Sequence, residues 1–331
     1  MYQEKPLLHK RQKAYQKGQL RTIALDVTTK CNMNCDHCYA DTFAAAEQLD
    51  LAYFKPVFDE AYALGVHHYV LQGGEAIVDE SRLEAIIDMI YPDETYINVV
   101  SNGWMMQKEC IAWLKALKVD KIAFSLDSGI EAEHDQRRKK GSFKRVLEAI
   151  DRVQEEGMLT SISTVVTHQS LYGDGFKKVL EIASAKKIRL DVQIAMPVGK
   201  WDGRKDILIT PEDARYIRKL RDESPVLPNG QQLINRDVFN YGGNDHCPAG
   251  GGFMGITADG HVLPCNFCQF SLGNISHKTL GRMRSDLIQN QWFNGTIPRC
   301  LLGEDAEFFD TYVRPYVNEK KPLDAYELFQ L

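Results

Sequence analysis

The most informative segment of this chain is Cys31-Asn32-Met33-Asn34-Cys35-Asp36-His37-Cys38. Its three cysteines, at the spacing C-x3-C-x2-C, follow an apolar run, so we expect a tight loop that directs three sulfurs toward one centre. Three thiolates are one ligand short of closing a tetrahedral zinc site or of capping all four irons of a [4Fe–4S] cluster. The loop therefore predicts either a cluster with one open iron or a structural zinc knuckle whose fourth ligand is distant.

Around this loop, segments of β-branched and apolar residues alternate with helical patterns. Strands are predicted at 22–27, 69–72, 96–100, 121–126, 160–166 and 189–196, and helices at 51–64, 81–90, 106–117, 142–156, 176–185 and 211–222. Six strand–helix repeats with short connections indicate a parallel sheet with right-handed crossovers. Periodicity alone does not separate an open doubly wound sheet from a curved barrel. In barrel-like α/β proteins, sites are built at the carboxyl ends of the strands.

Polar residues follow several of these strands. Gly73-Gly74-Glu75 comes after the second strand, where glycines let the backbone approach a ligand and a carboxylate can accept from an ammonium group. Ser101 and Asn102 end the third strand, and Ser125 and Asp127 end the fourth. Short hydroxyl, amide and carboxylate side chains suit a ribose. Ordinary turns and strand-end capping explain the same residues equally well.

A second group of cysteines lies near the C-terminus, at Cys247, Cys265, Cys268 and Cys300. Four thiolates suffice for one [4Fe–4S] cluster, and they also suffice for a structural zinc ribbon. Between the first two, residues 255–262 predict a hairpin that turns at Asp259-Gly260.

The cysteine loop resembles the signature of the radical S-adenosylmethionine (SAM) superfamily, C-x3-C-x-Φ-C, with His37 at the aromatic position Φ. The resemblance implies that Cys31, Cys35 and Cys38 hold three irons of a [4Fe–4S] cluster and that the fourth iron binds SAM. One electron would then cleave SAM to a 5′-deoxyadenosyl radical, which abstracts a hydrogen atom from a substrate carbon. The resemblance also implies a partial (β/α)6 TIM-like barrel and a reductant of the flavodoxin or ferredoxin type.

The same resemblance implies the residues that bind SAM. Gly73, Gly74 and Glu75 are similar to the family's motif for the SAM amino group, although Ala76 stands where the family usually has proline. Arg138 would pair with the SAM carboxylate, with an exposed basic loop as the alternative. Val166 would pack on adenine, with a plain core valine as the alternative. The other implied contacts with SAM or substrate are His37, Tyr39, Ser101, Asn102, Ser125 and Asp127, of which Asp127 is also a candidate catalytic residue.

The C-terminal cysteines, the hairpin and Gly273-Asn274 resemble the SPASM/twitch auxiliary-cluster domain in its shorter form. This implies a second [4Fe–4S] cluster on Cys247, Cys265, Cys268 and Cys300. Cys265 and Cys268 are closer together in the sequence than the corresponding later pair of cysteines often is in that family. The alternative is therefore that three thiols ligate and that a free Cys268 donates a hydrogen atom to a substrate radical, as in epimerases.

We expect four regions: a basic N-terminal arm (1–20), the radical SAM barrel (21–200), a bridging segment (201–246), and the auxiliary-cluster domain with the C-terminal tail (247–331). The arm is predicted to be solvated, with its cations at Lys5, Lys10, Arg11, Lys13 and Lys17. The formal charge of −5 and the lack of an apolar run of ~20 residues argue against a nucleic-acid-binding surface and a membrane span. Eight cysteines without a signal peptide favour a cytoplasmic protein over a disulfide framework.

Two clusters predict one-electron chemistry at an unactivated C–H bond. Our main hypothesis is an oxidoreductase or epimerase acting on a carbohydrate-like natural-product intermediate, and the alternative is a ribosomal peptide that is epimerised or cross-linked. A non-catalytic iron–sulfur electron carrier or zinc scaffold is a rival from another class. Only about twenty residues precede the first strand, so we expect no fused leader-binding domain of ~80 residues, which favours the small molecule slightly. Candidate substrate contacts are His168, Gln193, Lys200 and Asp245.

Overall fold

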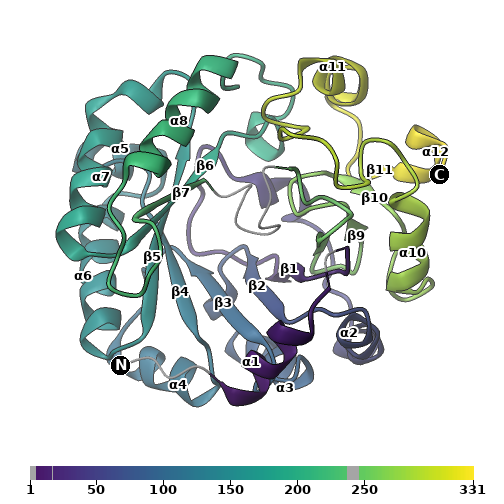
Figure 1. Ribbon diagram of the computed structural model, residues 1–331, viewed down its shortest axis with the longest axis horizontal. Coiled ribbons are helices and arrows are strands. Elements are labelled where there is room, and N and C mark those ends of the chain that lie inside the picture. The colour runs from purple at the N-terminus through teal and green to yellow at the C-terminus, as the bar shows by residue number, and fades with distance from the viewer. Residues whose placement is uncertain (1–4, 17, 237–245) are drawn as a thin grey trace.

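The computed structural model describes residues 5–16, 18–236 and 246–331, and its centre is one curved, mostly parallel sheet (Figure 1). The sheet has nine strands in the order β7-β6-β5-β4-β3-β2-β1-β8-β9. Consecutive order from β1 to β7 is the pattern of a barrel wall, so the predicted partial (β/α)6 barrel is confirmed. Its strands are β1 Thr22–Thr28, β2 His68–Gly73, β3 Tyr96–Ser101, β4 Lys121–Ser125, β5 Leu159–Val166, β6 Arg189–Ile194, β7 Ile234–Arg236, β8 Phe253–Ile256 and β9 Val262–Leu263.

Helices cover the outer face of this sheet, seen to the left and below the strands in Figure 1. The six predicted barrel strands are present, with ends that differ by one or two residues from the sequence pattern. No helix in the described part of the chain is long and apolar enough to cross a membrane. The helices are α1 Pro6–Ala14, α2 Phe54–Ala63, α3 Glu80–Met89, α4 Lys108–Ala116, α5 Glu131–Arg137, α6 Ser142–Glu155, α7 Asp174–Lys186, α8 Pro211–Glu223, α10 Leu280–Leu287, α11 Ala306–Phe308 and α12 Ala325–Phe329.

The two faces of the sheet have different chemistry. Along β2, Tyr69 and Leu71 are buried in the main core against the helices, whereas His68, Val70 and Gln72 face the barrel interior. The interior of a closed TIM barrel is usually packed with branched aliphatic side chains. Here the inward positions of several strands are polar, so the interior is suited to hold a ligand.

The C-terminal region extends the barrel wall, because β8 pairs in parallel with β1. The predicted hairpin is confirmed by the antiparallel pairing of Gly255 with Leu263 and of Ile256 with Val262. A small parallel sheet of β10 Phe270–Ser271 and β11 Leu323–Asp324 follows. Glu60 of α2 accepts hydrogen bonds from Leu280 N (2.7 Å) and Gly281 N (3.0 Å), which joins the first turn of α10 to the barrel.

The prediction of a solvated basic arm is wrong for two of its cations. Lys5 Nζ lies 2.7 Å from Asp120 Oδ2 and also donates to the backbone of the barrel. Arg11 donates to Val66 O at 2.8 Å, and its guanidinium lies 3.5 Å from the centre of the Tyr62 ring. Carbonyl groups next to the strand ends and the buried carboxylate of Asp120 need hydrogen-bond donors, and Lys5 and Arg11 supply them. Lys17 lies outside the described residues.

Candidate functional site

A cavity of ≈160 Å³, which we call the cofactor cavity, lies at the carboxyl ends of the barrel strands. It brings together side chains from the cysteine loop and from the segments that follow β2, β3 and β4, because parallel strands present these ends at one edge. The expected residues that line it are Cys31, Cys35, His37, Cys38, Tyr39, Gly73, Gly74, Glu75, Ser101, Asn102, Ser125 and Arg138.

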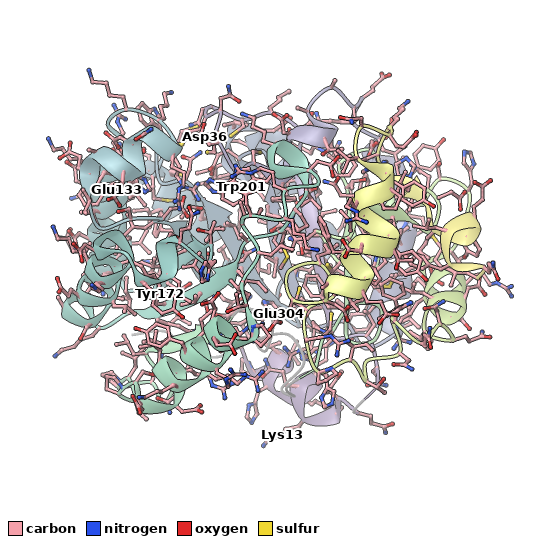
Figure 2. The ribbon with its side chains drawn as sticks, turned by 90° about the horizontal axis from the view of Figure 1, so that it is seen from above. Lys13, Asp36, Glu133, Tyr172, Trp201 and Glu304 are labelled. Atoms are coloured by element: carbon pink, nitrogen blue, oxygen red, sulfur yellow. The ribbon has the colours of Figure 1, made fainter. Side chains whose placement is uncertain are left out.

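Backbone contacts from distant segments hold the cysteine loop at this edge. Asp36 N donates to Arg137 O (2.9 Å), and Lys200 N donates to Cys38 O (3.1 Å). Gly199 must be glycine, because a Cβ there would lie 2.1 Å from Cys38 O. Figure 2 shows the neighbouring Trp201 between the barrel, in teal, and the C-terminal segment, in yellow. The loop is therefore clamped between the barrel and the segment after β6.

The glycines of the Gly-Gly-Glu motif serve a close approach between backbones. A Cβ on Gly73 would lie 2.5 Å from Thr28 O, and one on Gly74 would lie 2.1 Å from Lys30 O. Only glycine lets the end of β2 pass this close to the segment that leads into the cysteine loop. The motif thus fixes the position of Glu75 relative to the three thiols.

The environment of Glu75 indicates that the cavity fits a cation, such as the ammonium group of SAM. It is 3% exposed, and its Oε2 accepts from Asn102 N at 2.8 Å. Its Oε1 is buried and has no hydrogen-bond partner. Burial raises the pKa of Glu75 to about 7. A buried carboxylate oxygen without a partner is costly, and a bound ammonium group would remove that cost.

Asp127, Arg138 and His37 form a buried cluster of ionisable side chains beside the thiols. Arg138 Nε lies 2.5 Å from Asp127 Oδ2, and His37 Nε2 lies 3.4 Å from the same oxygen. Burial alone would raise the pKa of Asp127, but Arg138 and His37 outweigh it and hold that pKa below its usual range. Burial lowers the pKa of His37 to about 4, so its ring is neutral near pH 7.

Two expected contacts are placed differently by the structure. Asp127 is not among the residues that line the cavity; its carboxylate lies behind Arg138 and accepts from Val165 N at 3.1 Å. Val166 belongs to the core between sheet and helices and is 1% exposed, whereas Val165 lines the cavity. Because side chains alternate along a strand, the neighbouring residue takes the inward position. The core alternative for Val166 is therefore the right one.

The four C-terminal cysteines lie near one another. Hydrogen bonding with Cys265, burial and the thiols of Cys247 and Cys300 raise the pKa of Cys268 well above its usual range. Cys300 Sγ lies 3.8 Å from Sδ of Met196, which lines the cofactor cavity. One methionine thus separates this group from the first site.

The position of Cys268 bears on its role. It is 2% exposed and is not among the lining residues, whereas the preceding residue, Phe267, does line the cavity. This placement favours a ligand over a hydrogen donor. In the ranges that the structure describes, no three His, Cys, Asp or Glu side chains are arranged to hold a single metal ion.

Sequence reasoning missed several residues of the cavity. Gln72, Trp201 and Phe267 line it, and only Gln72 left a signal, as a polar residue at an inward position of an apolar strand. Of the candidate substrate contacts, Gln193 lines the cavity. His168 is instead exposed and lies 2.8 Å from Asp213, and Lys200 binds Asn34 at the surface. Asp245 lies outside the described residues.

Comparisons with known proteins agree with this geometry. Residues 25–197 match the family described as the Radical SAM superfamily, and residues 247–304 match SPASM, an iron–sulfur cluster-binding domain. These two matches include the cysteine loop and all four C-terminal cysteines.

Among relatives of known function, the antilisterial bacteriocin subtilosin biosynthesis protein AlbA of Bacillus subtilis (strain 168) is 28% identical over 276 residues. The alignment covers 81% of this chain but 60% of that protein. An AdoMet-dependent heme synthase of Methanosarcina barkeri is 24% identical, with 77% and 79% of the two chains covered. Streptococcus suis SuiB bound to the precursor peptide SuiA shares the fold, with a TM-score of 0.63 at 16% identity, covering 98% of this chain and 79% of that one.

Proposed function

Because this chain belongs to the radical SAM superfamily, we propose that it is an enzyme that modifies a ribosomally made peptide at an unactivated C–H bond. The family carries a [4Fe–4S] cluster and SAM as cofactors, and the SPASM domain carries auxiliary iron–sulfur clusters. An electron carrier without catalysis has no use for a SAM cavity, so an enzyme is the better interpretation. The modification that we propose is an oxidation, an epimerisation or a cross-link of the peptide.

The peptide replaces the carbohydrate-like intermediate of our main hypothesis. AlbA takes part in bacteriocin biosynthesis, and SuiB binds a precursor peptide, and both likenesses favour a peptide. The slight preference for a small molecule depended on the short N-terminal arm alone, which is a weaker argument than these likenesses.

The shape of the interior is the structural observation that carries the proposal. The cofactor cavity shares Gln72, Val100, Ser163, Gln193 and Phe267 with a second cavity of ≈500 Å³. Residues lining both cavities make them neighbours along the barrel axis. A long interior lined by side-chain amides and hydroxyls suits an extended peptide, whose backbone groups all need hydrogen-bond partners.

The residues of the site take roles that follow from their placement. Cys31, Cys35 and Cys38 would hold the cluster, Glu75 would bind the SAM amino group, and Arg138 would neutralise the SAM carboxylate. When bound, the cluster and SAM supply the one-electron chemistry that removes a hydrogen atom from a substrate carbon. Asp127 would keep Arg138 charged and oriented. Cys247, Cys265, Cys268 and Cys300 would hold an auxiliary cluster, and a flavodoxin- or ferredoxin-type protein would supply the electron.

A direct test is to combine the anaerobically reconstituted enzyme, SAM and dithionite with short peptides encoded near its gene. We expect 5′-deoxyadenosine and a mass change in one peptide. A loss of two hydrogens means oxidation or cross-linking, and one deuterium gained from heavy water means epimerisation. If 5′-deoxyadenosine forms but no peptide changes, the peptide proposal is wrong. If a fully loaded enzyme forms none, the catalytic role itself is wrong.

A further inference from the structure

The larger cavity of ≈500 Å³, which we call the interior cavity, reaches the amino ends of the barrel strands. Its lining includes Gly157 and Lys187, in the turns that lead into β5 and β6, and Gln12 of α1. These three residues are exposed at the surface of the molecule. At its other end, the interior cavity shares residues with the cofactor cavity. The interior is therefore open at the amino ends of the strands, whereas a closed TIM barrel is packed.

Side-chain amides from three elements line this opening, which we call the mouth. They belong to Gln12 of α1, to Gln154 of α6, and to Asn229 and Gln231 of the hairpin at 226–232. A side-chain amide both donates and accepts hydrogen bonds, as a peptide unit does. The mouth is therefore suited to the backbone of a polypeptide.

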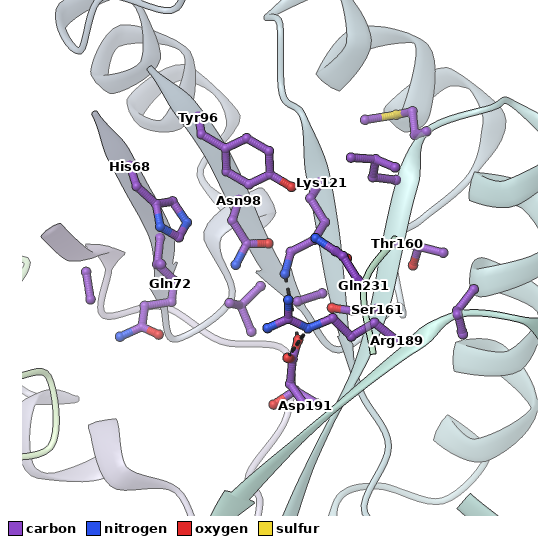
Figure 3. A pocket seen from close by; sticks show the side chains of 18 of the residues that line it. His68, Gln72, Tyr96, Asn98, Lys121, Thr160, Ser161, Arg189, Asp191 and Gln231 are labelled. Carbon is purple, nitrogen blue, oxygen red and sulfur yellow. Dashed lines mark hydrogen bonds and ion pairs between the residues drawn. The ribbon is translucent and has the colours of Figure 1, made fainter. Parts of the chain in front are cut away.

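Deeper in the interior cavity, buried polar atoms lack partners. Asn98 of β3 is 5% exposed, and its Oδ1 has no hydrogen-bond partner in the described part of the chain. The same holds for Oγ1 of Thr160 on β5. Both residues line the cavity, as Figure 3 shows. Buried polar groups without partners are costly, and a bound peptide backbone would supply partners.

The register of the strands gives this lining a repeat that an extended peptide shares. Val70 of β2 pairs with Asn98, so Gln72 lies two residues further toward the cofactor cavity than the level of Asn98. Two residues of a strand rise by about 7 Å. An extended peptide presents equivalent backbone groups on one side at the same interval. The amides of Asn98 and Gln72 can therefore bind one segment of peptide that runs along the barrel.

Strand β3 gives the length of this path. Tyr96 lines the interior cavity at one end of the strand, and Ser101 lines the cofactor cavity at the other end. Five steps along a strand span about 16 Å. About five residues of an extended chain therefore reach from the amino ends of the strands to the cofactor cavity.

We propose that the interior cavity is a second route into the barrel, through which an extended tail of the peptide substrate reaches the cofactor cavity from the mouth. This inference depends on the proposed function and adds how the substrate is held: through its backbone, by Asn98, Gln72 and the amides of the mouth. Because amides bind backbone groups, the tail can vary in sequence at these positions.

Photo-cross-linking of the full-length, cluster-loaded enzyme in the presence of SAM tests the route. The probes are two pools of randomised ten-residue peptides, with benzoylphenylalanine at the amino terminus in one pool and at the carboxyl terminus in the other. We expect one pool to cross-link to the mouth, at residues 227–231 or at Gln12, and the other to segments that line the cofactor cavity. Excess unlabelled peptide should abolish both cross-links. The pool that marks the mouth gives the direction of the bound chain.

Variants assign the binding to this route. Gln231→Trp adds bulk at the mouth and should lower cross-linking several-fold. Gln232→Trp is the matched control, because this neighbour is equally exposed but is not among the described residues that line the cavity. Asn98→Leu removes a hydrogen-bonding group and should weaken peptide binding about three- to ten-fold. Its unfolding midpoint should stay unchanged or rise, because aliphatic side chains suit a barrel interior. All three variants should bind SAM normally.

Three results would overturn the inference. Cross-links confined to the carboxyl ends of the strands in both pools would place the whole peptide there. Equal cross-linking of Gln231→Trp and Gln232→Trp would show that the mouth is not used. A lack of any cross-link that unlabelled peptide abolishes would also reject the route. The mass change of a modified peptide then decides separately whether the substrate is a peptide.

Discussion

At the scale of single residues, Glu75 and Asp127 are two buried carboxylates with opposite environments. Glu75 keeps one oxygen without a partner and has a raised pKa, so it lacks a cation. Asp127 already has Arg138 and His37, and its pKa is held low. The first carboxylate has an oxygen available to a positively charged ligand, and the second orients Arg138, which lines the cavity.

Glu75→Gln tests the first role. The amide retains an acceptor for Asn102 N but loses the charge, so we expect SAM to bind roughly 10- to 100-fold more weakly while the unfolding midpoint stays unchanged or rises. Equilibrium dialysis of labelled SAM against the cluster-loaded protein measures this. Glu80→Gln, at the exposed start of α3, is the control. An unaltered SAM affinity in Glu75→Gln would remove this residue from the cofactor site.

Asp127→Asn tests the second role. It leaves the buried guanidinium of Arg138 without its carboxylate, which should destabilise the fold by about 3 kcal/mol. Urea unfolding followed by circular dichroism gives the free energy. The control is Asp93→Asn, which removes a partner of Lys118 at 2.7 Å in a pair that is half exposed and should cost less than about 1 kcal/mol. Similar losses in the two variants would contradict the buried network.

At the scale of elements, the strands separate two environments by alternation. In β5, Val165 faces the cofactor cavity and Val166 faces the helices, so two chemically identical neighbours have different tasks. The same alternation places Ser161 and Ser163 on the interior wall of the barrel and Ile162 in the core. Each barrel strand therefore supplies both core and site.

A pair of alanine substitutions tests this division. Val166→Ala removes two buried methyl groups from the core and should cost about 2 kcal/mol of unfolding free energy. Val165→Ala should cost less than about 1 kcal/mol and should instead weaken SAM or peptide binding, because its side chain lines a cavity that is already open. Chemical denaturation gives the unfolding free energy of each variant, and equilibrium dialysis gives its affinity for the ligand. A larger stability loss at Val165 would mean that the register of β5 is wrong.

At the scale of the whole molecule, the C-terminal region completes the site from the other end of the sequence. Pairing of β8 with β1 brings Phe267 to the cofactor cavity, and Cys300 reaches Met196 after β6. Met196 thus lies between the C-terminal cysteine group, which it contacts through Cys300, and the cavity that Cys31, Cys35 and Cys38 line.

Cys268→Ala tests the auxiliary centre. Two [4Fe–4S] clusters carry about eight irons per chain, and loss of one ligand should lower the count toward about four. Iron and zinc analysis, with electron paramagnetic resonance of the reduced protein, measures the change. Cys110→Ala, a partly buried cysteine of α4 outside both groups, should keep the full count. An unchanged count in Cys268→Ala would show that Cys268 is not a ligand and would revive the hydrogen-donor alternative.

Strand periodicity and motif spacing are local properties of the chain, so they predict the barrel repeats, the cysteine loop and most of the residues that line the cofactor cavity. The three-dimensional arrangement was needed to show that Val165 rather than Val166 faces inward and that Asp127 pairs with Arg138. It also showed that Arg21, Lys121 and Arg189, at or next to the amino ends of three strands, line one interior cavity. Those outcomes depend on register and on the curvature of the sheet, which bring together residues that no local pattern relates.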